Sequence, residues 1–211
     1  MPGNTKRMAM MAVMASLAVS VGAQYNLRIL HVNDHHSYVE EKSWNVKTDT
    51  QALLGCDSIK EVRFKYGGYA RLNQLLADLT AGTKDIAAPK TAGNVLKLHA
   101  GDAMTGTLWY TLFKGVADAQ VMGKACFHAM SSGNHEFDDG DQNLAYFIQN
   151  LTEATKGCPS GSTKMVAANV VPGESSPLKT PTELLAKSKV FTLGDQKVRS
   201  HDNNTHLRVP R

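Results

Sequence analysis

Three short polar clusters in the sequence carry side chains that bind metal ions or transfer protons. They are Asp34-His35-His36, Gly101-Asp102 and the segment from Ser132 to Asp138, which reads Ser-Gly-Asn-His-Glu-Phe-Asp. Each cluster follows a short apolar run typical of a buried strand. Because the carboxyl ends of parallel strands meet at one edge of a sheet, we expect the three clusters to converge there. Carboxylate, imidazole and amide groups gathered in this way suit a hydrolase that uses two metal ions.

The first two clusters supply candidate metal ligands. Asp34 and His36 lie two positions apart, so a carboxylate oxygen and an imidazole nitrogen can chelate one ion. Asp102 has two carboxylate oxygens, which can bridge two ions about 3.5–4 Å apart. Each of these patterns also occurs in a solvated turn, and it is their combination that indicates a metal centre.

The third cluster adds a ligand and a candidate proton-transfer pair. Asn134 can offer a neutral amide oxygen to the second ion, whereas the adjacent His135 is directed toward the substrate. Asp138 lies three residues further on and can hydrogen-bond His135, which favours the imidazolium form. A cationic imidazole beside a phosphate stabilises the negative charge of the transition state. We interpret Glu136 as a structural or surface residue rather than a further ligand.

The other conspicuous rings have structural interpretations. His31, His99 and His128 alternate with or flank strand residues, and we expect them to be hydrogen-bonded structural histidines. His35 lies between two proposed ligands and is expected to point away from His36. The Trp109-Tyr110 pair is interpreted as packing rather than as a platform for a base.

Alternating strand-like and helix-like segments predict an α/β fold with a largely parallel or mixed sheet. Predicted strands cover residues 27–32, 95–100, 129–131, 164–171 and 189–193. Predicted helices cover a stripe from Leu72 to about Gly82, residues 107–113 and 116–127, a stripe over 144–151, and residues 182–186. Residues 40–66 show no steady period and are predicted to form a long irregular excursion, which Cys56 could anchor.

The first 23 residues predict a secretory signal peptide. Lys6 and Arg7 precede an apolar run from Met8 to Val21, and small residues follow up to Ala23, where we expect cleavage. The product would be secreted or extracellular, and periplasmic in a bacterium. The alternative is an uncleaved anchor helix, although the run is shorter than the roughly 20 apolar residues that span a bilayer. We expect no other membrane span.

Composition limits the remaining function classes. The 211 residues are 42% hydrophobic, which is enough for one substantial domain with its own core. Loss of Lys6 and Arg7 with the leader lowers the formal net charge from +4 to +2. A charge this small and dispersed argues against a nucleic acid polymer as partner.

The three cysteines leave more than one pairing open. A secreted protein can form disulfides, and Cys56 and Cys158 lie in loop-like sequence where they could pair. Cys126 lies in an apolar helical stretch and is interpreted as a buried free thiol. The odd count also allows a partner outside this chain.

Taken together, the motifs resemble the calcineurin-like metallophosphoesterases, and within them the secreted 5′-nucleotidase/apyrase/UDP-sugar hydrolase family. The matching segments are Leu30–Ser37 (LHVNDHHS), Gly67–Leu72 (GGYARL), His99–Thr107 (HAGDAMTGT) and Gly133–Asp138 (GNHEFD). They occur in order within residues 25–198. The resemblance implies a metallophosphoesterase-type α/β/β/α sandwich.

The resemblance also implies two divalent ions, with zinc expected and manganese or another divalent ion as the alternative. The implied ligands are Asp34, His36, Asp102 and Asn134. His135 and Asp138 would form the catalytic pair, while an activated water attacks phosphorus in line. The implied substrates are small phosphate esters, foremost nucleoside 5′-phosphates, with diphosphates, triphosphates, UDP-sugars and cyclic nucleotides left open.

The resemblance ends near Val198. The family pattern continues with another His ligand, a Gly-His-x-His motif that supplies two more ligands, and a C-terminal domain that binds the nucleoside. Residues 199–211 are polar and aperiodic instead, so we expect a truncated or frame-shifted domain with a disordered tail. The predicted organisation is a signal peptide (1–23), the N-terminal part of a catalytic domain (24–198) and the tail. Because four ligands leave two ions under-coordinated, the alternative function is an inactive secreted fragment or pseudoenzyme.

Overall fold

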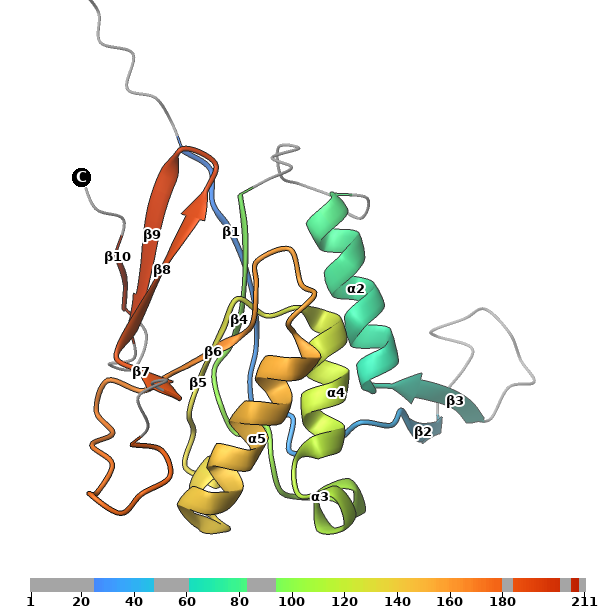
Figure 1. Cartoon of the computed structure of the whole chain (residues 1–211). Coiled ribbons are helices and arrows are strands. Elements are labelled where there is room, and N and C mark those ends of the chain that lie inside the picture. Colours follow the sequence, from blue (N-terminus) through green and yellow to red (C-terminus); the bar gives the residue numbers. More distant parts are fainter. Residues whose placement is uncertain (1–24, 48–60, 83–93, 180–183, 202–205, 209–211) are drawn as a thin grey trace, which may run out of the picture.

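The computed structural model describes residues 25–47, 61–82, 94–179, 184–201 and 206–208 (Figure 1). The predicted signal peptide and Cys56 lie outside these residues. Among the described residues, none of the helices combines the length and the apolarity needed to traverse a bilayer.

A five-stranded sheet forms the centre of the molecule, in the order β1-β4-β5-β6-β7. The strands are β1 (Arg28–Val32), β4 (Val95–His99), β5 (Ala129–Ser131), β6 (Lys164–Val166) and β7 (Leu185–Ala186). All four pairings are parallel. The segments that follow β1, β4 and β5 therefore leave the sheet at the same edge, as the sequence predicted.

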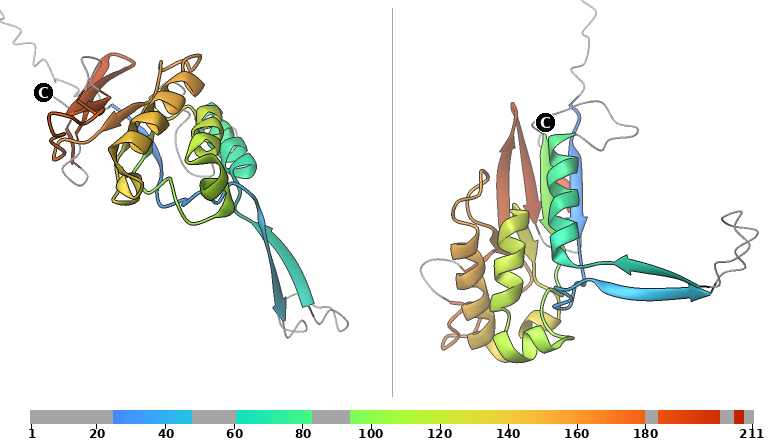
Figure 2. Two further views of the ribbon diagram at one scale, coloured as in Figure 1. Left: turned by 60° about the horizontal axis from the view of Figure 1, so that its bottom comes forward. Right: turned by 90° about the vertical axis from the view of Figure 1, so that its right-hand side faces the viewer.

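Helices α2 (Tyr69–Ala81), α4 (Val116–Ala125) and α5 (Gly140–Ala154) cover one face of this sheet (Figures 1 and 2). The short helix α3 (Leu108–Phe113) lies at the end of this layer and packs on α4. The apolar stripe of α5, with Leu144, Phe147 and Ile148, is buried in one core with Met130 and Met165 of the strands. The helices predicted from periodicity are confirmed here, with α4 ending two residues before the predicted end.

The opposite face of the central sheet packs against a second, antiparallel sheet. That sheet contains β8 (Ser188–Leu193), β9 (Gln196–His201) and β10 (His206–Arg208). The second core joins Leu96, Ala129 and Val166 of the first sheet to Phe191, Leu193 and Val198 of the second. The layers of the described residues are therefore helix, sheet and sheet, which are three of the four layers of the predicted α/β/β/α sandwich.

The prediction of an irregular excursion over residues 40–66 was wrong at both of its ends. β2 (Lys42–Lys47) and β3 (Glu61–Tyr66) pair as an antiparallel ribbon that projects from the body (Figure 2). Trp44 is paired with Phe64 in this register, and both side chains are exposed. Because the strands are short and lie outside the core, their alternation produced no clear burial signal in the sequence.

The cysteine assignment also needs correction, since Cys126 is not a free thiol. It forms a disulfide with Cys158, with a Cα–Cα distance of 5.6 Å. Cys126 caps the end of α4 and Cys158 follows α5, and the two helices pack closely where Gly123 faces Ala154. The pairing of Cys126 with Cys158 therefore depends on the packing of α4 against α5, which local sequence patterns do not show.

Three further predictions fail near the C-terminus. Residues 199–201 complete β9 and residues 206–208 form β10, so these parts of the predicted tail are ordered strand. The predicted strand 164–171 is limited to Lys164–Val166. Leu185 and Ala186, predicted as helix, pair with β6 as a short strand instead. In the first and third cases a neighbouring strand supplies hydrogen bonds that local sequence does not reveal.

Candidate metal centre

The first two polar clusters are connected by backbone hydrogen bonds beyond the ends of β1 and β4. Asp34 N–H donates to Gly101 O at 3.0 Å, and His36 N–H donates to Asp102 O at 3.1 Å. Ser37 N–H continues the series with a 2.9 Å bond to Ala103 O. The two loops therefore run side by side, and each proposed ligand is placed by its backbone.

These loops adopt an unusual backbone conformation. Seven described non-glycine residues have a positive φ, and five of them lie here. The five are Asp34, His36, Ser37, Asp102 and Thr105. L-residues rarely adopt left-handed φ, and such positions persist where surrounding contacts enforce them.

Glu136 joins the third cluster to the second. Its buried carboxylate accepts hydrogen bonds from the N–H groups of Gly133 (2.5 Å), Asp102 (2.9 Å) and Ala103 (2.8 Å). Burial raises the pKa of Glu136, while these N–H groups lower it. The loops approach so closely that a Cβ on Gly133 would collide with the Asp102 carboxylate. Glu136 is thus a structural hydrogen-bonding residue, one of the two interpretations that the sequence allowed.

Three proposed site residues converge at the sheet edge. Ligand atoms of His36, Asp102 and His135 all lie within 4.8 Å of one another. Asp34 Oδ1 lies 3.9 Å from His36 Nε2, at the border of the same group. Asn134 immediately precedes His135 and is exposed. Imidazole nitrogen and carboxylate oxygen at this spacing fit a divalent metal ion.

His135 and Asp138 form the pair that the sequence predicted. His135 Nδ1 donates to Asp138 Oδ2 at 2.7 Å, and the His135 N–H donates to Asp102 Oδ1 at 3.0 Å. The hydrogen bond that His135 donates to Asp138 is the main cause of the raised pKa of His135. Since Nδ1 is engaged, Nε2 is the nitrogen available for a ligand.

Helix α3 begins beside this edge. Its N-cap Thr107 accepts a hydrogen bond from Trp109 N–H and donates through Oγ1 to Ser37 O at 2.8 Å. The Trp109 ring stacks on Phe113, with ring centroids 5.6 Å apart. This contact agrees with the interpretation of Trp109 as a packing residue.

Sequence reasoning missed the residues beneath the loops. His35 points away from His36, as expected, but its partners are His99 and Asp118, with Ser37 and Tyr69 beside them. Asp118 lies within α4 and was not singled out, although a lone acid in an apolar helical run is an available signal. Of the other structural histidines, His128 binds Lys97 N–H as expected, whereas His31 is exposed.

Comparison with known proteins places these features in a family. The model of the calcineurin-like phosphoesterase family matches residues 27–207. The NAD 5′-nucleotidase of Haemophilus influenzae is 34% identical over 172 residues, which cover 82% of this chain and 23% of that protein. The probable 5′-nucleotidase of Treponema pallidum is 37% identical over 159 residues, or 75% of this chain and 22% of that protein.

The fold gives the same result. The structure of the Haemophilus influenzae NAD nucleotidase superimposes with a TM-score of 0.62 at 35% identity, covering 82% of this chain and 25% of that chain. The chain thus spans about a quarter of the length of these relatives. Its loops, its sheet order and its sequence lead to one assignment: the chain belongs to the calcineurin-like phosphoesterase family.

Proposed function

We propose that this chain takes part in the hydrolysis of phosphate monoesters, with nucleoside 5′-phosphates as the substrate class, at a centre of two divalent metal ions. The convergence of His36, Asp102 and His135 at the sheet edge carries the proposal. The 5′-nucleotidases among the relatives support the substrate class.

Each site residue has a distinct role in this proposal. Asp34, His36, Asp102 and Asn134 would hold the ions, which would supply Lewis-acid polarisation of a phosphoryl oxygen when bound. His135 directs Nε2 at the phosphate and donates a hydrogen bond to its oxygen as negative charge develops. Asp138 fixes the Nδ1 proton of His135 and favours the imidazolium form, because its hydrogen bond raises the pKa of that ring.

We also propose that the protein works in an oxidising compartment, as a secreted or periplasmic protein. The Cys126–Cys158 disulfide supports this location, since disulfides persist outside the reducing cytosol. The charged and apolar leader in the sequence is consistent with export.

The test is metal-dependent release of inorganic phosphate from AMP by the full chain. With Zn²⁺ or Mn²⁺ present, His135→Ala is expected to lower the rate by about 10²–10⁴-fold, the usual contribution of a proton-transferring side chain. His31→Ala is the matched control, because His31 is exposed on β1 and its neighbours Leu30 and Val32 face the helix core. Equal rates for the wild type and His135→Ala would contradict the proposal for this chain.

A second candidate is metal binding without hydrolysis, as in a pseudoenzyme. Among the described residues, only three side chains form a compact ligand group, which favours weak coordination. Calorimetry distinguishes the two candidates. Tight binding of two Zn²⁺ equivalents together with AMP hydrolysis supports the enzyme, whereas binding without hydrolysis supports the second candidate.

A further inference from the structure

A buried chain of hydrogen bonds lies directly beneath the two ligand loops. His35 Nδ1 lies 2.9 Å from His99 Nε2, and His35 Nε2 lies 3.1 Å from Asp118 Oδ1. Ser37 Oγ donates to the other oxygen of Asp118 at 2.9 Å. These hydrogen bonds therefore connect the loop after β1, the end of β4 and helix α4.

The direction of each hydrogen bond follows from one backbone group. Gly101 N–H donates to His99 Nδ1 at 3.2 Å, so this nitrogen carries no hydrogen. Burial lowers the pKa of His99, and His35 lowers it further, which agrees with a neutral ring. The His99 hydrogen then resides on Nε2 and is donated to His35 Nδ1, and His35 donates its own from Nε2 to Asp118.

The chain of hydrogen bonds is almost fully enclosed. The side chain of His35 is 7% exposed and that of Asp118 is fully buried, as are Ser37 and His99. The Tyr69 hydroxyl lies 3.3 Å from His35 Nδ1 and closes the chain from α2. A buried polar group that loses its partner costs about 1–3 kcal/mol, so each member restricts the next.

The residues in this chain of hydrogen bonds lie next to the proposed ligands in the sequence. His35 lies between Asp34 and His36, and Gly101, which binds His99, precedes Asp102. Fixing the His35 ring therefore fixes the left-handed backbone on both of its sides, and fixing Gly101 places Asp102. None of the chain members belongs to the ligand group itself.

We propose that His35, His99 and Asp118 are positioning residues, which hold the Asp34–His36 loop against the Gly101–Asp102 loop and so pre-form the metal centre. The inference rests on the proposed function for its metal-binding consequence. Its structural part, the fixing of the two loops, stands independently. Partners behind metal ligands typically contribute 10–100-fold in metal affinity.

Two histidine variants provide the main test. His99→Leu removes the link between Gly101 N–H and the His35 ring, whereas His128→Leu removes a half-buried histidine that binds Lys97 N–H elsewhere on the sheet. Calorimetry with Zn²⁺ alone is expected to show affinity about 10–100-fold weaker for His99→Leu, and unchanged for His128→Leu. Hydrogen exchange on the metal-free chain is expected to accelerate at the amides of His36 and Ser37 in His99→Leu only.

A second pair separates positioning from general loss of stability. Asp118→Asn keeps an oxygen to accept from His35 and offers its amide to the Ser37 hydroxyl, so affinity and amide protection should stay near the wild-type values. Asp118→Leu removes both acceptors and should behave as His99→Leu does. If His99→Leu does not fold, the comparison of Asp118→Asn with Asp118→Leu still tests the positioning role.

The outcomes separate the two proposals. Equal affinity and equal amide protection in the His99→Leu and His128→Leu variants would overturn the positioning role. If the wild-type chain binds no Zn²⁺, the proposed function fails, and amide exchange alone then judges the positioning role. Faster exchange in Asp118→Leu but not in Asp118→Asn supports it, and equal exchange in both contradicts it.

Discussion

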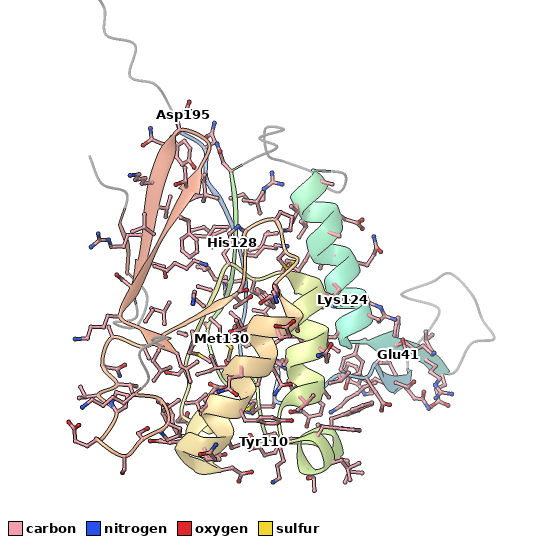
Figure 3. The ribbon with its side chains drawn as sticks, in the orientation of Figure 1. Glu41, Tyr110, Lys124, His128, Met130 and Asp195 are labelled. Carbon is pink, nitrogen blue, oxygen red and sulfur yellow. A yellow bond between two sulfur atoms is a disulfide. The ribbon has the colours of Figure 1, made fainter. Side chains whose placement is uncertain are left out.

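The two ends of the central sheet each hold a buried or half-buried histidine in opposite electrostatic surroundings. At the carboxyl end, the hydrogen bonds of His99 lead through His35 to the carboxylate of Asp118. At the amino end, His128 is flanked by Lys97 and Lys189, whose positive charges add to burial in lowering its pKa to about 4. Figure 3 shows His128 well separated from Tyr110, which follows β4 at the carboxyl end.

The two ends are also held together in different ways. The amino end lies near the disulfide at Cys126, and Lys97 and Lys189 donate to backbone carbonyl groups there. The carboxyl end depends on buried hydrogen bonds that enforce a left-handed backbone. Covalent and packing interactions thus stabilise the fold at the amino end, whereas the polar contacts of the carboxyl end hold the loops of the candidate site in a strained conformation.

The largest effect expected is on activity, from a change at the carboxyl end. Asp102→Asn keeps the oxygen that accepts from His135 N–H but removes the charge proposed to bridge the ions. We expect AMP hydrolysis to fall roughly a thousandfold, with no loss of thermal stability. Phosphate release checks the loss of activity, and a melting curve on the same preparation checks that the thermal stability is unchanged. A parallel fall in stability would remove the distinction between the two ends.

The next effect is on stability, from a change at the amino end. The double substitution Cys126→Ser and Cys158→Ser opens a link across a sequence separation of 32 residues. Chain entropy predicts a loss of about 3.7 kcal/mol in the free energy of unfolding. Urea denaturation gives this value, and Zn²⁺ affinity of the folded variant should equal that of the wild type. Weakened metal binding would show that the disulfide also shapes the site.

Glu136 should affect both properties, because it fastens the loops of the carboxyl end. Glu136→Gln places an amide NH₂ against backbone N–H donors, and we expect a loss of about 2 kcal/mol in stability. Zn²⁺ affinity should fall as well, since the carboxylate aligns Asp102 with His135. Thr155→Val is a suitable control, as Thr155 is a buried hydrogen-bonding residue that binds Leu151 O and Thr163 N–H. Equal metal affinity in both variants would argue against this role of Glu136.

The smallest effect concerns pH and the amino end. The pKa of His128 is lowered from 6.5 to about 4 in the folded chain, so between these values the unfolded chain binds the extra proton. Stability is therefore fully present above about pH 6.5 and declines as the pH falls toward 4. His128→Gln should lessen this decline by on the order of 1–2 kcal/mol, since partial exposure screens the full shift. Urea titrations at pH 7 and pH 5 give the free energy of unfolding of both proteins. An equal loss of this free energy between the two pH values in wild type and His128→Gln would exclude His128 as the source of the decline.

Much of the fold followed from sequence because its elements obey local rules. The stripes of α2 and α5 and the apolar runs of β1, β4 and β5 all bury one face or both. The hairpin β2–β3 did not follow, because its apolar residues face solvent. Cys126 was misassigned because its pairing depends on how α4 packs on α5, which no local pattern encodes.

The candidate site was predictable where residues adjacent in sequence act together. The pair His135–Asp138 and the turn of His35 away from His36 both follow from short-range geometry. Asp118 was not predictable in this way, because its partner His35 is 83 residues away in sequence. The ligand roles of Asp34, His36, Asp102 and Asn134 and the catalytic roles of His135 and Asp138 stay predictions, for which metal titration and activity of single variants are the direct measurements.

The positions of the two tryptophans give the molecule a built-in optical contrast. Trp44 is 64% exposed on the projecting ribbon, whereas Trp109 stacks on Phe113 beside the ligand loops. Emission from the first reports a water-like environment, and emission from the second reports the packing around α3. Trp44→Phe would therefore leave Trp109 as the one tryptophan, so that tryptophan emission reports on the packing of α3 beside the candidate metal centre without any attached dye.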